Sequence, residues 1–457
     1  MKYLKYIGVA VMALSVGLLA SCSDDDDSSA AMSVNSVYLE DASSSVTNHD
    51  RQVEFARLGQ LIRIQGSGFT GLKKIYINGY ETYFNNALMT DNNVWVTLNS
   101  KTPVAGADES VRNKIRLYKS DDNYLDYDFV IRAAAPSVSS ISLTLPQPGE
   151  KVTVYGSNLQ ETTTITLPDG TVVNSGIESD EDGEYYTFTM PSDVDNTIGG
   201  SIISEGANGT AKTPACFNER RGMILDLDGN GVQGGWSATY TSDQVVADPL
   251  NSGRGNVFPL IPEDVQTDGG IGAGTQAKGW FTAGNGTDPV WADAFSCVDP
   301  TTDVSNIALQ FDIYCPEEWN NSGMIEFTFQ NNLSNYGWGS TETTNTTNIS
   351  YPTAVVWVPW MDRETGENIG PFKTEGWQTI TIPLSLVGKY QNGGTFADVS
   401  ADREAASYKN FGMFFVNKDI EFSEDIIYPS ARWNQKVYID NWRIVPYEKF
   451  TISDFND

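Results

Sequence analysis

The chain has 457 residues, a formal net charge of −30 and a single histidine, His49. This length is enough for about three domains. The negative charge repels phosphate backbones and anionic membranes, so nucleic acid is not expected as a partner, whereas neutral ligands and divalent cations are allowed. A multi-histidine zinc site cannot be built, and a Ser-His-Asp or Cys-His arrangement would need His49 itself.

The first residues predict export and lipidation. Lys2 and Lys5 precede a mostly apolar run over 7–19, which is too short for a comfortable membrane span and ends in small residues before Cys22. This pattern predicts a signal peptide over 1–21 and resembles the lipobox of bacterial lipoproteins, in which Cys22 would carry the lipid. A soluble secreted protein is the alternative. No later stretch is apolar enough to span a bilayer, so the lipid would be the only membrane anchor.

An acidic tether is expected over 22–33. It contains four consecutive aspartates, Asp24 to Asp27, and a plain solvated linker would explain them. An acidic run directly after the lipid cysteine also resembles the surface-export signal of Bacteroidetes lipoproteins. That resemblance implies an outer-membrane protein facing the cell exterior, with the periplasm-facing leaflet as the alternative.

A repeated motif predicts two tandem sandwiches. Short alternating runs are separated by turn residues, as in a β-sandwich. The run around Gly66 recurs around Gly156, 90 residues later (156 − 66), and each copy ends in an apolar residue expected to cap a core, Phe69 or Leu159. A period of this length indicates tandem domains rather than a solenoid. The motif resembles immunoglobulin-like IPT/TIG domains, which look like spacers.

The predicted fold class is all-β, with two IPT/TIG sandwiches over 34–134 and 135–218, followed by a larger jelly-roll sandwich over 219–457. Ala133 to Pro136 is expected to form an extended, stiff linker between the first two. Ten of the eleven tryptophans lie in the last domain. Two of them, Trp377 and Trp442, occur within strong strand patterns and are expected in the core.

The cysteines beyond Cys22 are Cys216, Cys297 and Cys315. Cys297 and Cys315 could form a disulfide, which export would permit, or all three could be free buried thiols. The sequence does not decide between these alternatives.

The segment beginning at Asp226 imitates an EF-hand loop. It places Asp226, Asp228 and Asn230 at positions one, three and five, but position twelve is Ser237 instead of Glu. A simple turn after a strand is the main alternative. Jelly-roll sandwiches often hold a structural Ca²⁺, for which Asp226 or Asp228 could act together with Asp440. No other cofactor is expected.

Several aromatic residues of the last domain are surrounded by Asn, Thr, Ser and Gly, a context typical of loops and solvent-facing strands. Exposed aromatic patches usually mark binding sites. Flat rings beside amides and carboxylates suit a sugar, because the pyranose C–H face stacks on the ring and its hydroxyls take hydrogen bonds. The predicted platform consists of Trp338, Tyr336, Trp360 and Trp291, with Trp357 and Trp319 behind them.

Three segments of the last domain resemble carbohydrate-binding jelly rolls. They are the acidic strand that opens the domain, Gly222–Gly229, the run Gly376–Leu384 and the strand Tyr438–Ile444. Together with the lipobox, the acidic run and the two IPT/TIG copies, they resemble a cell-surface glycan-binding protein of a Sus-like polysaccharide-utilisation system, of the xyloglucan- and β-glucan-binding type. This resemblance implies non-catalytic capture of a polysaccharide or oligosaccharide and its delivery to an outer-membrane transporter complex. The alternatives are a glycoside hydrolase with a carboxylate pair and an adhesin that binds protein through its Ig-like domains.

Overall fold

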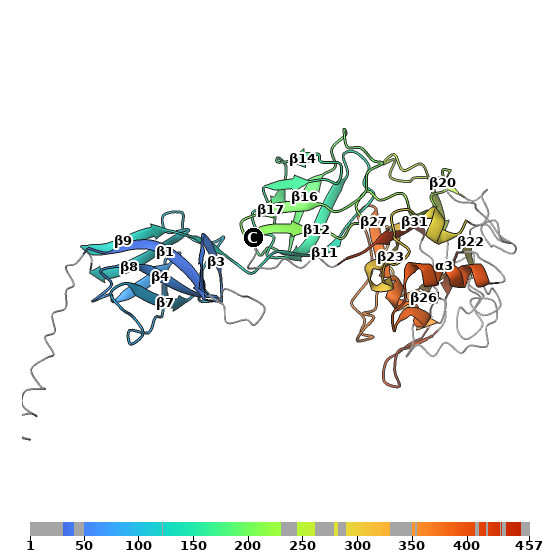
Figure 1. Ribbon diagram of the computed structural model, residues 1–457. Helices are drawn as coiled ribbons and strands as arrows, with labels where there is room; N and C mark the ends of the chain where they lie inside the picture. The colour runs from blue at the N-terminus through green and yellow to red at the C-terminus, as the bar shows by residue number, and fades with distance from the viewer. Residues whose placement is uncertain are drawn as a thin grey trace, which may run out of the picture. The chain divides into compact units, whose positions relative to one another are not determined.

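The computed structural model describes residues 31–40, 50–120, 122–229, 245–260, 278–281, 289–329, 350–351, 354–406, 411–416, 419–429, 431 and 436–448. The predicted signal peptide, Cys22, Asp24 to Asp27 and His49 lie outside these ranges. The chain divides into two compact units, Met1–Ala135 and Pro136–Asp457 (Figure 1). The border between them falls within the stretch predicted to be a linker.

The N-terminal unit contains two four-stranded antiparallel sheets. The first has the order β2 (Asp50–Val53), β1 (Ser33–Glu40), β4 (Leu61–Ser67) and β7 (Asn93–Thr97). The second has the order β6 (Tyr80–Thr82), β5 (Lys74–Ile77), β8 (Lys114–Ser120) and β9 (Asn123–Asp128). A short parallel pair, β3 (Phe55–Arg57) and β10 (Val130–Arg132), completes the unit.

Alternating apolar residues build the core of this unit. Ile62 and Ile64 of β4 are fully buried, and Arg63 between them faces outward, as the period-two geometry of a strand requires. Strands β5 and β6 form an antiparallel hairpin. It turns at Asn78 and Gly79, which both have positive φ, the conformation that a two-residue hairpin needs.

A second sandwich follows at the start of the C-terminal unit. One sheet has the order β11 (Ser137–Ile141), β12 (Lys151–Ser157), β16 (Tyr185–Thr189) and β15 (Glu178–Ser179). The other has the order β14 (Val172–Val173), β13 (Thr164–Thr166), β17 (Ile203–Gly206) and β18 (Gly209–Lys212).

The predicted repeat is present in the structure. A Cβ on Gly66 would clash with the carbonyl oxygen of Ser33, and a Cβ on Gly156 would make the same clash with Ser137. Both glycines therefore allow a close approach between neighbouring strands, and a β-bulge follows at the same register in each pair. Next to these corners the capping residues, Phe69 and Leu159, are buried as expected.

The third sandwich also has two antiparallel sheets. The first runs β20 (Val246–Ala247), β21 (Asn256–Leu260), β31 (Val437–Pro446), β23 (Ile307–Tyr314) and β27 (Gln378–Pro383), with β19 (Met223–Leu225) also on β31. The second runs β22 (Lys278–Phe281), β28 (Gly412–Val416), β24 (Met324–Thr328), β26 (Ala354–Trp357) and β25 (Ser350–Tyr351). A hairpin of β29 (Ile420–Glu421) and β30 (Ile427–Tyr428), helices α2 (Trp291–Ala294) and α3 (Phe396–Ala405), and 3-10 turns Val304–Asn306, Leu384–Leu386 and Gly388–Tyr390 complete it.

The all-β fold class is confirmed, and the central strands of the third sandwich are buried on both faces. Seven of the eight residues of β23 are buried. One face contributes Leu309 and Phe311 to the core of the third sandwich. The other face contacts the second sandwich, whose core includes Ala308 and Val445. A strand covered on both sides reads as a continuous apolar run rather than an alternating one.

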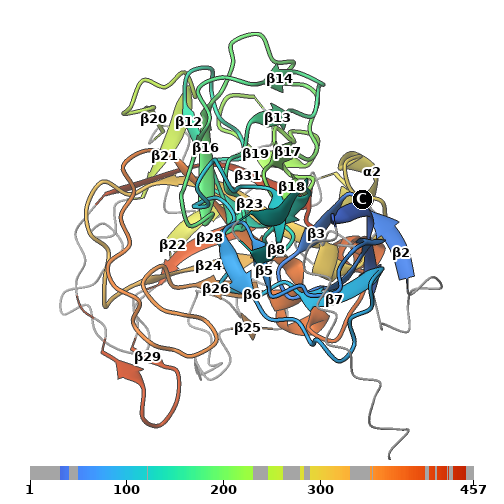
Figure 2. The same ribbon diagram turned by 90° about the vertical axis from the view of Figure 1, so that its left-hand side faces the viewer.

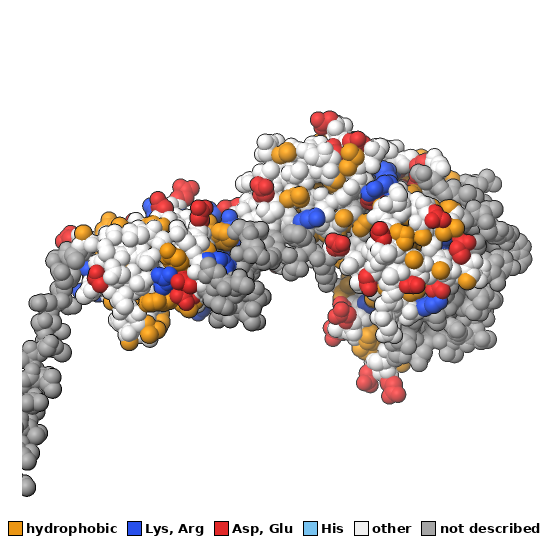
Figure 3. Space-filling model, in the orientation of Figure 1, with side chains coloured by type: hydrophobic (Ala, Val, Ile, Leu, Met, Phe, Trp, Pro, Cys, Tyr) orange, Lys and Arg blue, Asp and Glu red, His pale blue; other side chains and the backbone are white. Residues whose placement is uncertain are grey.

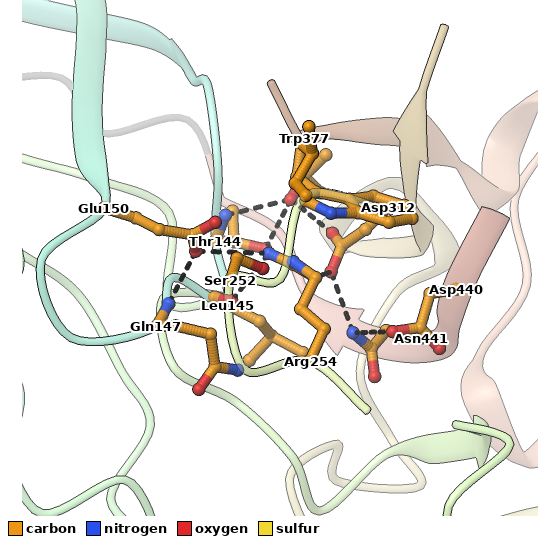
Figure 4. Close-up of polar contacts among 12 residues, drawn as sticks. Thr144, Leu145, Gln147, Glu150, Ser252, Arg254, Asp312, Trp377, Asp440 and Asn441 are labelled. Carbon is orange, nitrogen blue, oxygen red and sulfur yellow. Dashed lines mark hydrogen bonds and ion pairs between the residues drawn. The ribbon is translucent and has the colours of Figure 1, made fainter. Parts of the chain in front are cut away.

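Buried polar groups join the second and third sandwiches, which Figures 1 and 2 show side by side near β23 and β31. At the centre is Asp312, which is completely buried and accepts four hydrogen bonds, drawn in part in Figure 4. The donors are Arg254 (2.8 Å), Thr379 (2.6 Å), Asn441 (3.0 Å) and Arg443 (3.3 Å). We call these five residues together with Thr144 the interface network.

Residues of the second sandwich complete the interface network from the other side. The hydroxyl of Thr144 accepts a hydrogen bond from Arg443, and its backbone N–H donates to Thr379 at 2.9 Å. Arg254 also donates to the carbonyl oxygen of Leu145 at 3.0 Å and lies 3.6 Å from Glu150. Because so many buried donors and acceptors pair across this contact, the two sandwiches behave as one body.

Two further observations complete the fold. No helix within the described residues is long and apolar enough to cross a membrane. Cys216, Cys297 and Cys315 are free thiols, so the free-thiol alternative is the one found. Burial raises the pKa of Cys216 to about 11 and of Cys297 and Cys315 to about 12, which keeps them protonated and unreactive near neutral pH.

Candidate functional site

An aromatic cluster lies at the end of β26, in the sheet of the third sandwich that does not face the second sandwich. Its central residue is Trp357, the one predicted platform residue within the described ranges that is only half-buried. The Trp357 ring makes edge contacts with Phe372 (5.4 Å between centroids), Phe311 (5.5 Å) and Trp319 (6.0 Å). These neighbours fix the orientation of the ring, so little rotamer freedom would be lost on binding.

Three asparagines lie in the loops that flank this cluster. The side-chain amide of Asn368 donates to the side-chain oxygens of Asn320 (2.9 Å) and Asn321 (2.6 Å). The loops are held together by paired backbone hydrogen bonds between Trp319 and Phe372. Asn321 and Asn368 are exposed. Fixed aromatic edges next to exposed amides can receive a neutral polyhydroxylated ligand by stacking and hydrogen bonding.

Trp291 and Trp360 are in the core, so their assignment to an exposed platform is wrong, and Trp319, predicted to lie behind the platform, is buried as well. Trp291, Trp319 and Trp360 are 2%, 0% and 0% exposed. Trp291 packs on Phe295 and lies under the guanidinium of Arg403, at 3.6 Å.

Hydrogen bonds explain why two of these large rings are tolerated inside. The indole N–H groups of Trp319 and Trp360 both donate to the carbonyl oxygen of Ser322, at 2.6 Å and 3.1 Å. A buried indole needs such an acceptor. The polar residues around these tryptophans in the sequence therefore belong to turns that cover the rings, and do not signal their exposure.

The remaining aromatic predictions have different outcomes. Tyr336 and Trp338 lie outside the described residues, and their role stays a prediction. Trp377 and Trp442, expected in the core, are buried there. Phe372 and Asn368 were not predicted for the site. They lie about 50 residues after Trp319, and no sequence pattern indicates that folding brings them next to it.

Two of the carboxylates proposed for calcium, Asp226 and Asp228, accept hydrogen bonds from nearby protein groups. Asp226 accepts hydrogen bonds from the backbone N–H groups of Asp228 and Gly229, which is the simple turn that the sequence offered as the alternative. Asp228 in turn accepts from the backbone and side chain of Asn256. Within the described ranges, no group of three or more acidic, cysteine or histidine side chains is placed to hold a metal ion. Asn230, at position five of the loop, lies outside these ranges, and the calcium assignment stays a prediction.

Asp440, the third of these carboxylates, belongs to the surroundings of the interface network. It is almost completely buried, and burial followed by the negative charge of Asp312 raises its pKa well above the usual value. Asp312 shows the opposite shift. Burial alone would raise its pKa, but the positive charges of Arg443 and Arg254 lower it. The two arginines therefore favour the ionised form of Asp312, whereas burial and the nearby Asp312 favour the neutral form of Asp440.

Comparisons with known proteins identify the family to which the chain belongs. Its final sandwich holds a half-buried tryptophan close to exposed amides, a combination that suits a sugar ligand. Residues 217–446, half of the chain, match the family model of the surface glycan-binding protein B xyloglucan-binding domain. The chain therefore belongs to the surface glycan-binding protein B family.

Two relatives extend the comparison beyond this domain. An IPT/TIG domain-containing protein of Bacteroides ovatus is 23% identical over 202 residues, which are 43% of this chain and 40% of that protein. The alignment thus spans less than half of the relative. The crystal structure of the surface glycan-binding protein PbSGBP-B of Prevotella bryantii is 20% identical, covers 91% of this chain and 99% of its own, and has a TM-score of 0.62, which shows a shared fold.

Proposed function

We propose that this protein captures a β-glucan or xyloglucan-type polysaccharide at the cell surface and passes it, chemically unchanged, to an outer-membrane uptake complex. The observation that carries this proposal is the family match over 217–446. The half-buried Trp357 and the Asn320, Asn321 and Asn368 amides supply suitable chemistry on the same domain. A formal charge of −30 also favours a neutral polymer over an anionic one.

Affinity electrophoresis of the full chain tests the capture of glycan. Gels containing xyloglucan, mixed-linkage β-glucan or an α-glucan would be compared. We expect the xyloglucan gel, and to a smaller extent the β-glucan gel, to retard the protein. Equal mobility in all three gels and in a gel without polysaccharide would refute the proposal. Release of reducing sugar from xyloglucan by the purified chain would contradict the non-catalytic part alone.

We also propose lipidation of Cys22 and display on the cell exterior, on the basis of the lipobox-like sequence and of Asp24 to Asp27. Such an anchor would keep weakly bound polymer near the membrane. Labelled fatty acid should be incorporated into the native protein but not into a Cys22→Ser variant. Added protease should remove the protein from intact cells. Substitution of the four aspartates by asparagine should abolish that sensitivity while labelling persists.

A further inference from the structure

The N-terminal unit carries a surface groove that the capture function described above does not use. It lies between the outward face of β7, at the edge of its sheet, and the loop that follows β6. A bridge between Phe84 and Val96 holds that loop against the strand. The groove has a volume of about 330 Å³, which is at the lower end of the range for small-ligand sites.

Large apolar side chains are exposed in this groove. Tyr83 is 82% exposed, Leu88 is 61% exposed and Leu61 is 38% exposed. Figure 3 shows hydrophobic side chains on the surface of this unit, on the side where Figure 1 labels β7. Exposure of such side chains in one place costs free energy in water, and a contiguous patch of this kind usually marks an interaction site.

Trp95 forms an oriented aromatic surface in the groove. Its neighbours on β7, Val94 and Val96, point into the core, so the indole lies on the outer face. The indole N–H donates to Glu40 at 2.8 Å, and Arg63 lies 3.5 Å from the same carboxylate. The ring is therefore held in place before any ligand arrives, which lowers the entropic cost of stacking on it.

The lining favours a neutral ligand. Among the described residues, none that lines the groove carries a charge, although the whole chain carries a formal charge of −30. The polar groups in the lining include the Tyr83 and Thr97 hydroxyls and the amide of Asn85, whose oxygen accepts from the N–H of Ala87 at 3.0 Å. Aromatic rings with a few hydroxyl and amide groups match the apolar faces and hydroxyl edges of a pyranose.

We propose that this groove is a second, weaker glycan subsite, which contacts a neutral pyranose segment of the same polysaccharide that the third sandwich captures. The assignment rests on the proposed capture function for the identity of the ligand. Because both sites belong to one chain, a polymer long enough to reach both makes the second contact intramolecularly, so even a weak contact in the groove raises the overall affinity. A short oligosaccharide cannot occupy two sites at once and gains nothing.

The test compares polymer and oligosaccharide binding by the full chain. The variant is Tyr83→Ala with Leu88→Ala, because both side chains are largely exposed and their removal leaves the core intact. The matched control is Tyr124→Ala, an exposed tyrosine of the same unit on β9, outside the groove. Affinities for xyloglucan polymer and for a xyloglucan heptasaccharide would be measured by titration calorimetry, with thermal unfolding to verify the fold.

We expect the double variant to lose at least about fivefold in polymer affinity while its heptasaccharide affinity and its unfolding temperature remain unchanged. The Tyr124→Ala control should bind polymer as the unmodified chain does. Polymer affinity that is unchanged in the double variant, or reduced equally by the control substitution, would overturn the subsite.

Hydrogen exchange separates this inference from the capture function. Millimolar heptasaccharide should slow amide exchange over residues 83–97 in the unmodified full chain, and the double variant should lose this protection. If the unmodified chain fails to bind xyloglucan polymer, the capture proposal is refuted. The exchange measurement then tests the subsite alone, because protection over residues 83–97 by heptasaccharide would still support it. Absence of protection over 83–97, in a chain that does bind polymer, refutes the subsite alone.

Discussion

At the scale of single residues, Asp312 supplies the negative charge of the interface network. It faces two buried guanidinium groups, those of Arg254 and Arg443. An Asp312→Asn substitution would remove the counter-charge that both cations share and leave Arg254 only Glu150, at 3.6 Å, so we expect a loss of about 3–5 kcal/mol in unfolding free energy. Urea denaturation would measure it. The matched control is Glu81→Gln, which breaks the exposed pair with Lys74 and should leave the midpoint unchanged.

The opposite pKa shifts of Asp312 and Asp440 predict opposite pH effects on stability. Because the pKa of Asp312 is lowered in the folded state, its stabilisation is complete above about pH 4 and disappears as the pH falls through the folded-state pKa. The pKa of Asp440 is raised, so this residue lowers stability increasingly as the pH rises above about 4.

An Asp440→Asn substitution tests the direction of this shift. The amide cannot ionise, so the variant should unfold at a higher temperature than the unmodified chain at pH 7. The difference should shrink toward pH 3, where the carboxyl is protonated in both the folded and the unfolded chain. Thermal unfolding across this pH range provides the measurement. A variant that is less stable at pH 7 would show that the Asp440 charge is favourable.

Trp360 and Trp338 should respond differently to substitution. Trp360 is fully buried and its indole is hydrogen-bonded to Ser322, so Trp360→Ala should reduce unfolding free energy by about 3–5 kcal/mol. Trp338→Ala should instead weaken xyloglucan retention without changing the unfolding midpoint. Denaturation and affinity electrophoresis of both variants distinguish the two roles. Normal stability of Trp360→Ala would show that its ring is not part of the core.

At the scale of elements, each of the two compact units contains one of the repeated glycine corners, so a substitution at one corner should change the stability of one unit only. A Cβ at Gly66 would clash with the Ser33 carbonyl, and one at Gly156 would clash with the Ser137 carbonyl. Calorimetry should therefore show two unfolding transitions, with Gly66→Ala lowering only one of them and Gly156→Ala only the other. Gly106→Ala and Gly376→Ala, where a Cβ would meet nothing within 4 Å, are the controls.

The sequence predicts these elements well because their signals are local. The Gly66 and Gly156 corners, the Asn78–Gly79 hairpin and the caps at Phe69 and Leu159 each depend on neighbours within one turn or one strand pair. Burial of tryptophans in the third sandwich depends on residues far away in the chain. Trp360, for example, packs against Tyr428 with 4.9 Å between centroids, so a polar local context misidentified it as exposed.

At the scale of the whole molecule, the second and third sandwiches form one compact unit that begins at Pro136. A fragment over 136–457 should therefore fold and bind xyloglucan with the oligosaccharide affinity of the full chain. A fragment over 219–457 would expose Asp312, Arg443 and the apolar contact of Trp377 with Leu143, and should aggregate or unfold at a lower temperature. Chromatography and calorimetry of both fragments provide the comparison.

This joining of two sandwiches could not be predicted from the sequence. The partners in the interface network lie up to 299 positions apart in the sequence (Thr144 to Arg443), and no periodicity marks Arg254 and Asp312 as belonging with them. An aspartate or arginine in a strand pattern ordinarily suggests a solvent-facing position. Only the packing of a second sandwich on the far face of β23 turns these residues into an interior network.

The interface network also has a mechanical consequence. If the captured polymer is pulled toward a transporter while the N-terminus remains fixed to the membrane, tension passes along the chain through Ala133 to Pro136. Charges that are buried and bonded across the second and third sandwiches resist separation, whereas the join at Ala135 and Pro136 lies between compact units. Stretching should thus extend the join first and leave the glycan-binding body undeformed, so that bound polymer is not released by the pull itself.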